Sequence, residues 1–446
     1  MVDFHQNGIL PTIHGLFEHF DRSDYLARLE NQLEEYGLRN PIGLVLPCHY
    51  SEIQNGAVMD RILDALRQIR YLHSVVIALG GADEEAQFLR ARQYFGSLRG
   101  HVKDLKVLWM EGPRVQALLS EIREHEIQTG TRGKGQSVWM ALGYLFSKEL
   151  CEVIAVHDCD IVNYDRLLLG RLAAPTANIH NVFEFSKGYY PRISESDRSL
   201  KGRVSRLLLT PLVDTLRSVM ADRGLRDLDH FFTYHAAFKY PLAGEVSFSA
   251  RLARSLDMVC DWALEVATLS EVYHRANRRK IVQIALTSNY EHKHQDLSVE
   301  DASKGLHRMA ADIGKFFFIY LRSHGFPLDD SFVGMIRHTY YDNARRFIKI
   351  YGDDAEMNGL NYDRHQEELT VGYFRDFLEE AWEQCKENPN GTLIPSWNRV
   401  LFSFPEIYGK IGMAVEEDNA RKAQVWTEDR ASRPRGMEDV KRHENR

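Results

Sequence analysis

The most constraining feature of this chain is a regular alternation of short apolar runs and amphipathic segments between residues 42 and 165. The apolar runs occupy positions 42–47, 74–79, 105–110 and 153–156. Between them, apolar residues recur at helical spacing over 58–70, 83–95 and 138–145. Strands that alternate with helices form right-handed crossover units. The sequence therefore predicts an α/β fold with a mostly parallel sheet flanked by helices.

Around this segment, the pattern divides the 446 residues into four parts. Residues 1–40 are expected to form an N-terminal helical segment, and residues 41–300 an α/β domain with halves at 41–165 and 166–300. Long amphipathic patterns over 302–322, 331–351 and 373–386 predict a mainly helical C-terminal region at 301–414. Residues 415–446 are dense in charge and poor in apolar residues, so we expect a partly disordered or loosely attached tail.

Composition excludes several classes of protein. Hydrophobic residues make up 44% and charged residues 27%, which is typical of a soluble globular protein. A net charge of -7 argues against a general nucleic-acid binder. The five cysteines are scattered and form no CxxC pair, which favours a reducing compartment over a disulfide framework. Neither a signal peptide nor a membrane span is visible, so we expect a cytoplasmic protein with no nucleic-acid or membrane partner.

Two aspartates follow the predicted strand at 153–156. Asp158 and Asp160 are spaced i, i+2, at the point where ligands bind in an open α/β sheet. Carboxylate oxygens are the ligands that Mg²⁺ and Mn²⁺ prefer. The pair therefore suggests a divalent metal that binds the phosphates of a nucleotide, although Asp-x-Asp also occurs by chance in many chains.

A glycine-lysine loop precedes the helix that leads to these aspartates. Gly133 and Gly135 let the backbone approach a ligand, and Lys134 supplies a charge for a phosphate next to the amides of a helix N-terminus. The spacing is not that of a P-loop. The alternative is a simple helix-entry turn, but the position one helix before the aspartates favours a nucleotide site.

Polar residues also follow the first two strands. Pro47, Cys48, His49 and Glu52 come after the first strand, where a base or ribose would bind, although a plain connecting loop is equally compatible. Asp83 follows the second strand and has a similar position, with capping of the next helix as the alternative.

Later motifs are candidates for a second substrate and for a metal ligand. Arg203 and Ser205 precede a helix-like apolar run and form a plausible anion site. Further polar groups lie in Pro-Leu-Ala-Gly-Glu, Asp-Trp-Ala-Leu-Glu and His-Lys-His, and one of the histidines could complete a metal shell. These groups are Gly244, Glu245, Glu265, His292 and His294.

The order of these motifs resembles that of GT-A glycosyltransferases over residues 40–300. In particular, it is similar to the retaining glucosyl-3-phosphoglycerate synthase family and, more distantly, to mannosylglycerate synthase. The resemblance implies a GT-A (Rossmann-like) fold. It also implies Mg²⁺ or Mn²⁺ as cofactor, with Asp160 and His292 as metal ligands.

The resemblance implies further roles for the remaining residues. Donor binding falls to Pro47, Cys48, His49, Glu52, Asp83, Gly133, Lys134 and Asp158. Acceptor binding falls to Arg203, Ser205, Gly244, Glu245 and His294, and the catalytic groups are Asp158, Lys134 and Glu265. Two positions depart from the family pattern: Cys48 replaces a small residue, and His294 replaces an asparagine.

The implied reaction moves glucose from UDP- or GDP-glucose to 3-phosphoglycerate with retention, in an enzyme expected to be a homodimer. In that family the acceptor hydroxyl attacks the face from which the diphosphate leaves, so no side-chain base is assigned. A mannosyl- or glucosyltransferase acting on glycerate or another small hydroxy acid or polyol remains an alternative. A sugar-phosphate nucleotidyltransferase is a second alternative, and a non-catalytic nucleotide-sugar binder is a third.

Overall fold

The computed structural model describes residues 6–54, 56–291, 305–389, 391 and 393–421. Its main feature is an eight-stranded sheet with the order β1-β11-β6-β9-β5-β2-β3-β4. Neighbouring strands are parallel except at β9, which is antiparallel to both β5 and β6. The predicted mostly parallel α/β fold is therefore confirmed. The strands are Thr12–Ile13 (β1), Ile42–His49 (β2), Leu72–Gly80 (β3), Asp104–Trp109 (β4), Val153–Val156 (β5), Phe185–Tyr189 (β6), Val246–Ser249 (β9) and Ile281–Ala285 (β11).

The central strands are buried on both faces, as expected for a parallel sheet covered by helices. Because β2, β3 and β5 run parallel, their carboxyl ends meet at one edge of the sheet. The amino end of β9 meets the same edge, since Val246 pairs with Val156. The residues that follow β2, β3 and β5, and those that precede β9, are therefore brought together there.

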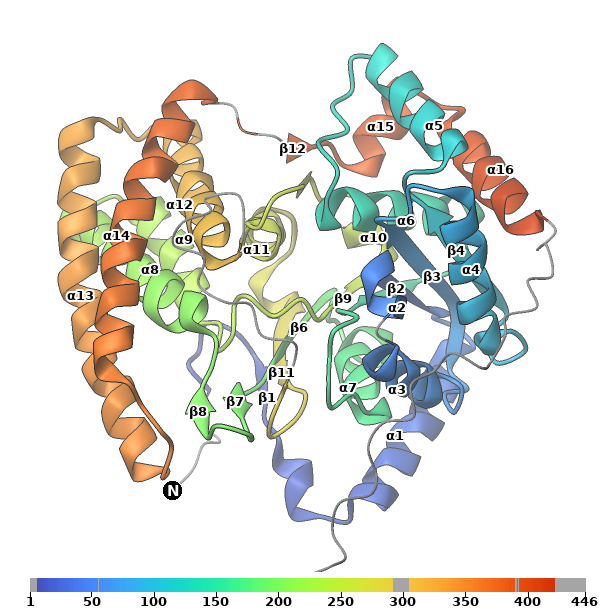
Figure 1. The fold of residues 1–446 in the computed structure, drawn as a ribbon, viewed down its shortest axis with the longest axis horizontal. Coiled ribbons are helices and arrows are strands. Elements are labelled where there is room, and N and C mark those ends of the chain that lie inside the picture. The colour runs from blue at the N-terminus through green and yellow to red at the C-terminus, as the bar shows by residue number, and fades with distance from the viewer. Residues whose placement is uncertain (1–5, 55, 292–304, 390, 392, 422–446) are drawn as a thin grey trace, which may run out of the picture.

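Helices cover both faces of the sheet (Figure 1). One face packs against α5 (Pro113–Glu124), α6 (Lys134–Lys148) and α16 (Ile407–Ala420) in one hydrophobic core. The other face packs against α1 (Arg22–Gly37), α3 (Ala57–Leu66), α4 (Glu85–Phe95) and α7 (Arg166–Ala177) in a second core. Shorter segments are α2 (Tyr50–Gln54) and α10 (Ala250–Ala253).

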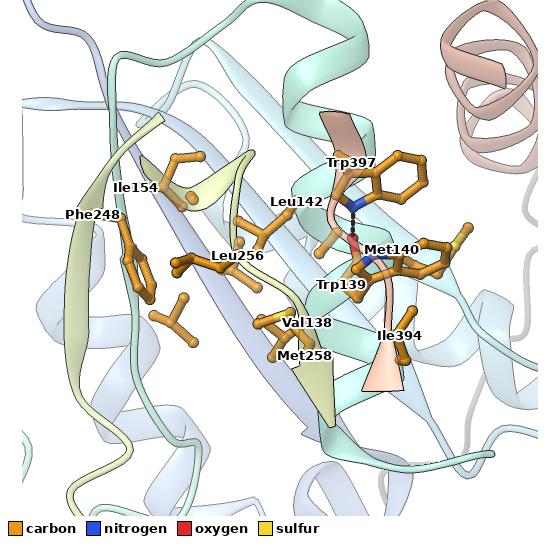
Figure 2. Close-up of a cluster of buried hydrophobic side chains, with 14 of the residues drawn as sticks. Val138, Trp139, Met140, Leu142, Ile154, Phe248, Leu256, Met258, Ile394 and Trp397 are labelled. Atoms are coloured by element: carbon orange, nitrogen blue, oxygen red, sulfur yellow. Dashed lines mark hydrogen bonds between the residues drawn. The ribbon is translucent and has the colours of Figure 1, made fainter. Parts of the chain in front are cut away.

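Helix α6 is the central helix of the first core, and the C-terminal part of the chain packs on it (Figure 2). The strand β12 (Leu393–Ile394) pairs with β10 (Met258–Val259), and α15 (Trp397–Ser403) follows. The indole of Trp397 stacks on that of Trp139 at 4.3 Å and donates to the Trp139 carbonyl at 2.8 Å. Gly143 allows this approach, because a Cβ there would lie 2.2 Å from the Trp397 ring.

A third core lies in a helical lobe, which we define as η3, α8, α9, α12, α13 and α14. This lobe lies to the left of the sheet in Figure 1. Because its core joins helices from both sides of residue 300, that predicted boundary does not separate two packing units. The bounds are Val204–Leu209 (η3, a π-helical turn), Thr210–Asp222 (α8), Arg226–Ala236 (α9), Gly305–Ser323 (α12), Asp330–Met357 (α13) and Arg364–Glu387 (α14).

Between the sheet and the helical lobe lie α11 (Leu264–Arg275) and a small hairpin. The hairpin strands, β7 (Ile193–Ser194) and β8 (Ser199–Leu200), are antiparallel. The loop before α14 contacts this hairpin, because Asn361 pairs with Ser199 in an isolated parallel bridge.

The structure departs from expectation at both ends of the chain. Thr12 and Ile13 form the edge strand β1 within the segment expected to be helical, because they pair with β11. Helix α16 continues to Ala420, past the expected start of the tail at residue 415. Val415 is buried, and Asp418 pairs with Arg114 at 2.8 Å, so tertiary contacts outweigh the charged composition.

Within the described residues, no helix is both long enough and apolar enough to span a membrane.

Candidate active site

A cavity of about 960 Å³ opens at the carboxyl edge of the sheet, between the sheet and the helical lobe. Its walls come from seven stretches of the chain. They lie within 131–134, 158–160, 192–205, 240–242, 260–265, 306–309 and 361–367. The glycine-lysine loop, the paired aspartates and the predicted anion site therefore line one cavity.

The lysine of the glycine-lysine loop lies between two carboxylates. Lys134 Nζ is 2.7 Å from Asp158 Oδ1 and 2.9 Å from Glu265 Oε1. Burial opposes the charged form of the lysine, but the two carboxylates outweigh it and raise the pKa of Lys134 well above its usual value. Lys134 is thus protonated and contacts both of the other residues, Asp158 and Glu265, to which the resemblance assigns a catalytic role.

The backbone at the start of α6 can make this approach only with glycines. A Cβ at Gly135 would lie 1.9 Å from the Val259 carbonyl oxygen, and a Cβ at Gly133 would lie 2.7 Å from that of Cys260. The loop therefore packs directly on the 258–265 segment, which carries Glu265. This contact brings Lys134 and Glu265 together, although they are 131 residues apart.

The second aspartate also lines the cavity. Burial, followed by the negative charge of Asp158, raises the pKa of Asp160 to about 7. Two carboxylates in one partly buried loop repel each other, so a divalent cation is the ligand that this pair fits.

The described residues contain no cluster of three or more potential metal ligands. The predicted ligand His292 and the predicted acceptor residue His294 lie outside the described residues. The structure therefore supplies the carboxylate pair, and the histidine remains a prediction.

The aspartate loop is supported from beneath by buried polar groups. His157 is fully buried, which lowers its pKa to about 4, and its Nε2 lies 3.0 Å from the Tyr164 hydroxyl. Gly244 packs against the Asp158 carboxylate, since a Cβ at Gly244 would lie 2.5 Å from Asp158 Oδ2.

Two predicted acceptor residues do not line the cavity. Glu245 is fully buried, and its carboxylate accepts hydrogen bonds from the hydroxyls of Tyr190, at 2.5 Å, and Tyr290. Gly244 contacts Asp158 instead of the open cavity. Neither residue is part of the cavity wall, because β9 directs this loop beneath the aspartates, and their assignment to the acceptor stays a prediction. Both residues support the loop of Asp158.

On the donor side, the residues after β2 do not all face outward. Cys48 is 3% exposed and its side chain belongs to the core, so the predicted donor-binding role is left to its exposed neighbours or to its backbone. His49 is exposed, and its ring packs under Gly81, where the backbone has a φ of +77°. Pro47 and Glu52 are partly exposed. Strand alternation explains the difference, because neighbouring side chains point to opposite faces.

Asp83 does not cap α4, whose N-cap is Glu84. It pairs instead with Arg132 at 3.0 Å, and Arg132 also contacts Glu111 at 2.8 Å. Glu111 in turn accepts from the Gly81 amide at 3.1 Å. Sequence reasoning missed Arg132, although it adjoins the glycine-lysine loop and lines the cavity.

The predicted anion site lies on the opposite wall. Arg203 and Ser205 line the cavity at η3, directly after Gly202, which has a φ of +74°. Sequence reasoning missed three further cations of this wall, because no motif marks them: Arg192, Lys201 and Arg308. Arg192 donates to the Tyr240 hydroxyl at 3.0 Å. The wall therefore carries more cations than the motif alone predicted, although Lys201 pairs with Asp197 at 2.7 Å and Arg203 with Glu367 at 3.1 Å. Arginine and lysine donors suit a phosphorylated ligand.

A mostly parallel sheet with an Asp-x-Asp loop and a lysine at its carboxyl edge, facing a second wall that carries several cations, is typical of a GT-A glycosyltransferase. Two curated relatives agree with this class. The chain is 40% identical over 421 residues to glucosyl-3-phosphoglycerate synthase of Persephonella marina, covering 94% of this chain and 100% of that protein. It is 35% identical over 425 residues to the enzyme of the same name from Methanococcoides burtonii, covering 94% and 98%. The chain therefore belongs to the glucosyl-3-phosphoglycerate synthase family.

Among solved structures, the chain is similar to glucosyl-3-phosphoglycerate synthase of Mycobacterium tuberculosis in complex with Mn²⁺, UDP-glucose and phosphoglyceric acid. The identity is 18%, the TM-score is 0.48, and the match covers 72% of this chain and 89% of that chain. No protein-family model matches the chain.

Proposed function

We propose that this protein transfers glucose from a nucleotide-glucose, UDP-glucose in the first instance, to 3-phosphoglycerate with retention of configuration. The observation that supports this most is the single cavity that joins two unlike walls. One wall carries Lys134 and the aspartate pair, and the other carries Arg203 and Ser205 with further cations. A diphosphate donor fits the first wall, and a small phosphorylated acceptor fits the second.

In this proposal, Asp160 and His292 hold Mg²⁺ or Mn²⁺, a metal that supplies charge neutralisation to the departing diphosphate. Asp158 and Glu265 hold Lys134 at the position where that negative charge develops. Glu265 also orients hydroxyls of the sugar. His49, Glu52 and the Gly133 backbone bind the nucleoside part of the donor.

Arg203 and Ser205 bind the phosphate and carboxylate of the acceptor and hold its hydroxyl beside the anomeric carbon. Much of the rate enhancement then comes from positioning. A donor phosphate oxygen takes the acceptor proton, so no side chain serves as general base. The bond from the anomeric carbon to the diphosphate breaks, and the new glycosidic bond forms on the same face.

The decisive assay combines purified protein and Mg²⁺ or Mn²⁺ with each donor and acceptor in turn. The donors are UDP-glucose, GDP-glucose and GDP-mannose, and the acceptors are 3-phosphoglycerate and glycerate. We expect release of nucleoside diphosphate and a glucosylated phosphoglycerate by mass spectrometry. Preference for glycerate or mannose would favour the alternative transferase, and release of pyrophosphate would favour a nucleotidyltransferase. No release with any pair would contradict the proposal.

We further propose that the enzyme acts in the cytoplasm as a homodimer. All five cysteines are free and buried, which suits a reducing compartment. The long helices α13 and α14 expose apolar side chains that a second copy could cover, including Met335, Ile350 and Leu369. Light scattering after gel filtration tests the dimer, and a monomer at micromolar concentration would contradict it.

A further inference from the structure

We propose that Glu367 on α14 is a positioning residue that fixes Arg203 for the phosphate of the acceptor. This inference rests on the proposed function and deepens it, because it assigns part of the acceptor site to the helical lobe. Glu367 is only 4% exposed, although it is a carboxylate at the wall of the cavity. A buried carboxylate needs partners, and those partners identify its role.

The carboxylate of Glu367 bridges two arginines that lie three residues apart at η3. Its Oε1 accepts from Arg203 Nε at 3.1 Å and from Arg206 Nη2 at 3.3 Å. Its Oε2 accepts from Arg206 Nη1 at 3.0 Å. Both oxygens are therefore engaged, and one negative charge separates two positive ones that would otherwise repel each other.

The two arginines are not equivalent. Arg206 is 8% exposed, donates to the Lys201 carbonyl at 3.0 Å and lies over the Tyr351 ring, so it is anchored within the helical lobe. The Arg203 side chain is 35% exposed and lines the cavity. Among the described residues, Arg203 hydrogen-bonds to Glu367 through Nε alone.

The geometry therefore leaves the two Nη groups of Arg203 to face a ligand. A guanidinium held at Nε presents its remaining donors in a fixed fork, which matches a phosphate. Without that contact, the free side chain would lose rotamer entropy on binding the ligand, so the contact preorganises the site.

The start of α14 is held against the same wall. The Asn361 amide donates to the Arg198 carbonyl at 2.7 Å, and its side-chain amide donates to the Asp197 carbonyl at 2.7 Å. These contacts attach the loop before α14 to the β7–β8 hairpin. Glu367, which lies one turn beyond the N-cap Asp363, is thereby fixed relative to the cavity.

A competing role for Glu367 predicts the opposite change in the KM for the acceptor. If Glu367 merely occupied Arg203 in the absence of substrate, removing its charge would release the arginine and lower the KM for the acceptor. If Glu367 positions Arg203, removing its charge raises that KM.

The test compares Glu367→Gln with the matched control Glu368→Gln. Glu368 is the next residue on α14, it is partly exposed, and among the described residues it forms an ion pair with Arg364 alone, at 2.9 Å. For each protein we would measure kcat, the KM of each substrate, Tm, and the ratio of kcat/KM for 3-phosphoglycerate to that for glycerate.

For Glu367→Gln we expect the KM for 3-phosphoglycerate to rise about 10-fold or more, as for the loss of a charge-assisted hydrogen bond. The KM for the nucleotide-sugar should stay within about twofold, and the preference for the phosphorylated acceptor should fall by the same factor as the acceptor KM rises. Glu367→Asp should recover part of that preference, and Glu368→Gln should match the unaltered protein.

An unchanged or lowered KM for 3-phosphoglycerate would overturn the inference. So would equal losses with both acceptors alongside a lowered Tm, which is the result expected of a merely structural residue. Calorimetric binding of 3-phosphoglycerate separates this failure from failure of the proposed function. If the unaltered protein binds but does not glucosylate it, the function fails and the affinity of Glu367→Gln still decides the inference. If it does not bind, both are overturned.

Discussion

The two walls of the cavity are built in different ways. On the sheet side, the charged groups sit directly at strand ends or helix starts, as Asp158 does after β5 and Lys134 at α6. On the helical side, the candidate phosphate-binding arginine is held by a carboxylate of a distant helix, since Arg203 contacts Glu367 across 164 residues.

The difference teaches that sequence motifs mark one wall better than the other. A strand end fixes its side chains locally, so residue order predicts the site. Asp312 on α12 illustrates the other case: it accepts from the Trp262 amide at 3.2 Å and pairs with Lys315 at 3.0 Å, while Lys315 also contacts Asp261 at 3.3 Å. The helical lobe thus supports the loop that leads to Glu265, and no sequence motif predicts this contact.

The largest effect is expected at Asp160, the proposed metal ligand on the sheet side. Asp160→Ala should lower kcat/KM by about 1,000-fold, because the departing diphosphate loses its metal-bound counter-charge. Steady-state kinetics with UDP-glucose and 3-phosphoglycerate would measure this. The control Asp64→Ala removes an exposed carboxylate of α3 that, within the described part of the chain, forms an ion pair with Arg67 alone, and it should leave kinetics unchanged. Full activity of Asp160→Ala would refute the metal assignment.

A smaller effect is expected at the lysine of the sheet-side wall, Lys134. Lys134→Ala removes the cation between Asp158 and Glu265, so kcat should fall by about 100-fold. Because the loss falls on charge that develops during the reaction, the KM for 3-phosphoglycerate should change much less. A variant with normal kcat and a raised acceptor KM would assign Lys134 to the acceptor instead.

The pH dependence of metal binding should follow Asp160. Its pKa is raised to about 7, so the carboxylate that a metal requires is protonated below that value and charged above it. Mn²⁺ affinity should therefore be about tenfold weaker at pH 6 than at pH 8, and it should level off above pH 8. Calorimetric titration at several pH values measures this. A flat profile would contradict the shifted pKa, and a steeper one would indicate a second titrating ligand such as His292.

The smallest effects are expected from two glycine substitutions that test packing, one on α6 beside the sheet and one on α14 in the helical lobe. Gly143→Ala drives a methyl group into the Trp397 ring and should lower stability by about 1–3 kcal/mol, with catalysis intact at low temperature. Gly372→Ala on α14 meets no atom within 4 Å and should raise stability by up to about 1 kcal/mol through helix propensity. Thermal unfolding of both variants tests the pair. Equal changes in Tm for the two variants would show that α15 does not pack on α6 as described.

Much of the sheet side was accessible from sequence. The apolar runs predicted β2, β3, β4 and β5, since buried parallel strands need continuous apolar residues. Their order around α6 predicted that Lys134 and Asp158 belong to one site, whereas their direct contact is seen only in the structure. The two-residue strand β1 was missed, because its pairing with β11 depends on residues about 270 positions away.

Side-chain direction is what the motifs did not predict. Cys48 and Glu245 stand in the predicted motifs, but both are buried, one in the core and one beneath the aspartate loop. A motif fixes which residue stands at a strand end, whereas the neighbouring strands decide which face it points to.

The sequence by itself determined the alternating architecture, the glycine-lysine loop and the aspartate pair, because strand burial and strand-end chemistry are local properties of the chain. Only the tertiary structure decided that the helical lobe shares a core across residue 300, that Val415 and Asp418 are buried, and that Glu367 holds Arg203. Those features depend on contacts between residues far apart in sequence. The sequence shows that a residue is charged or that a helix face is apolar, but it does not show which distant residue or face it will contact.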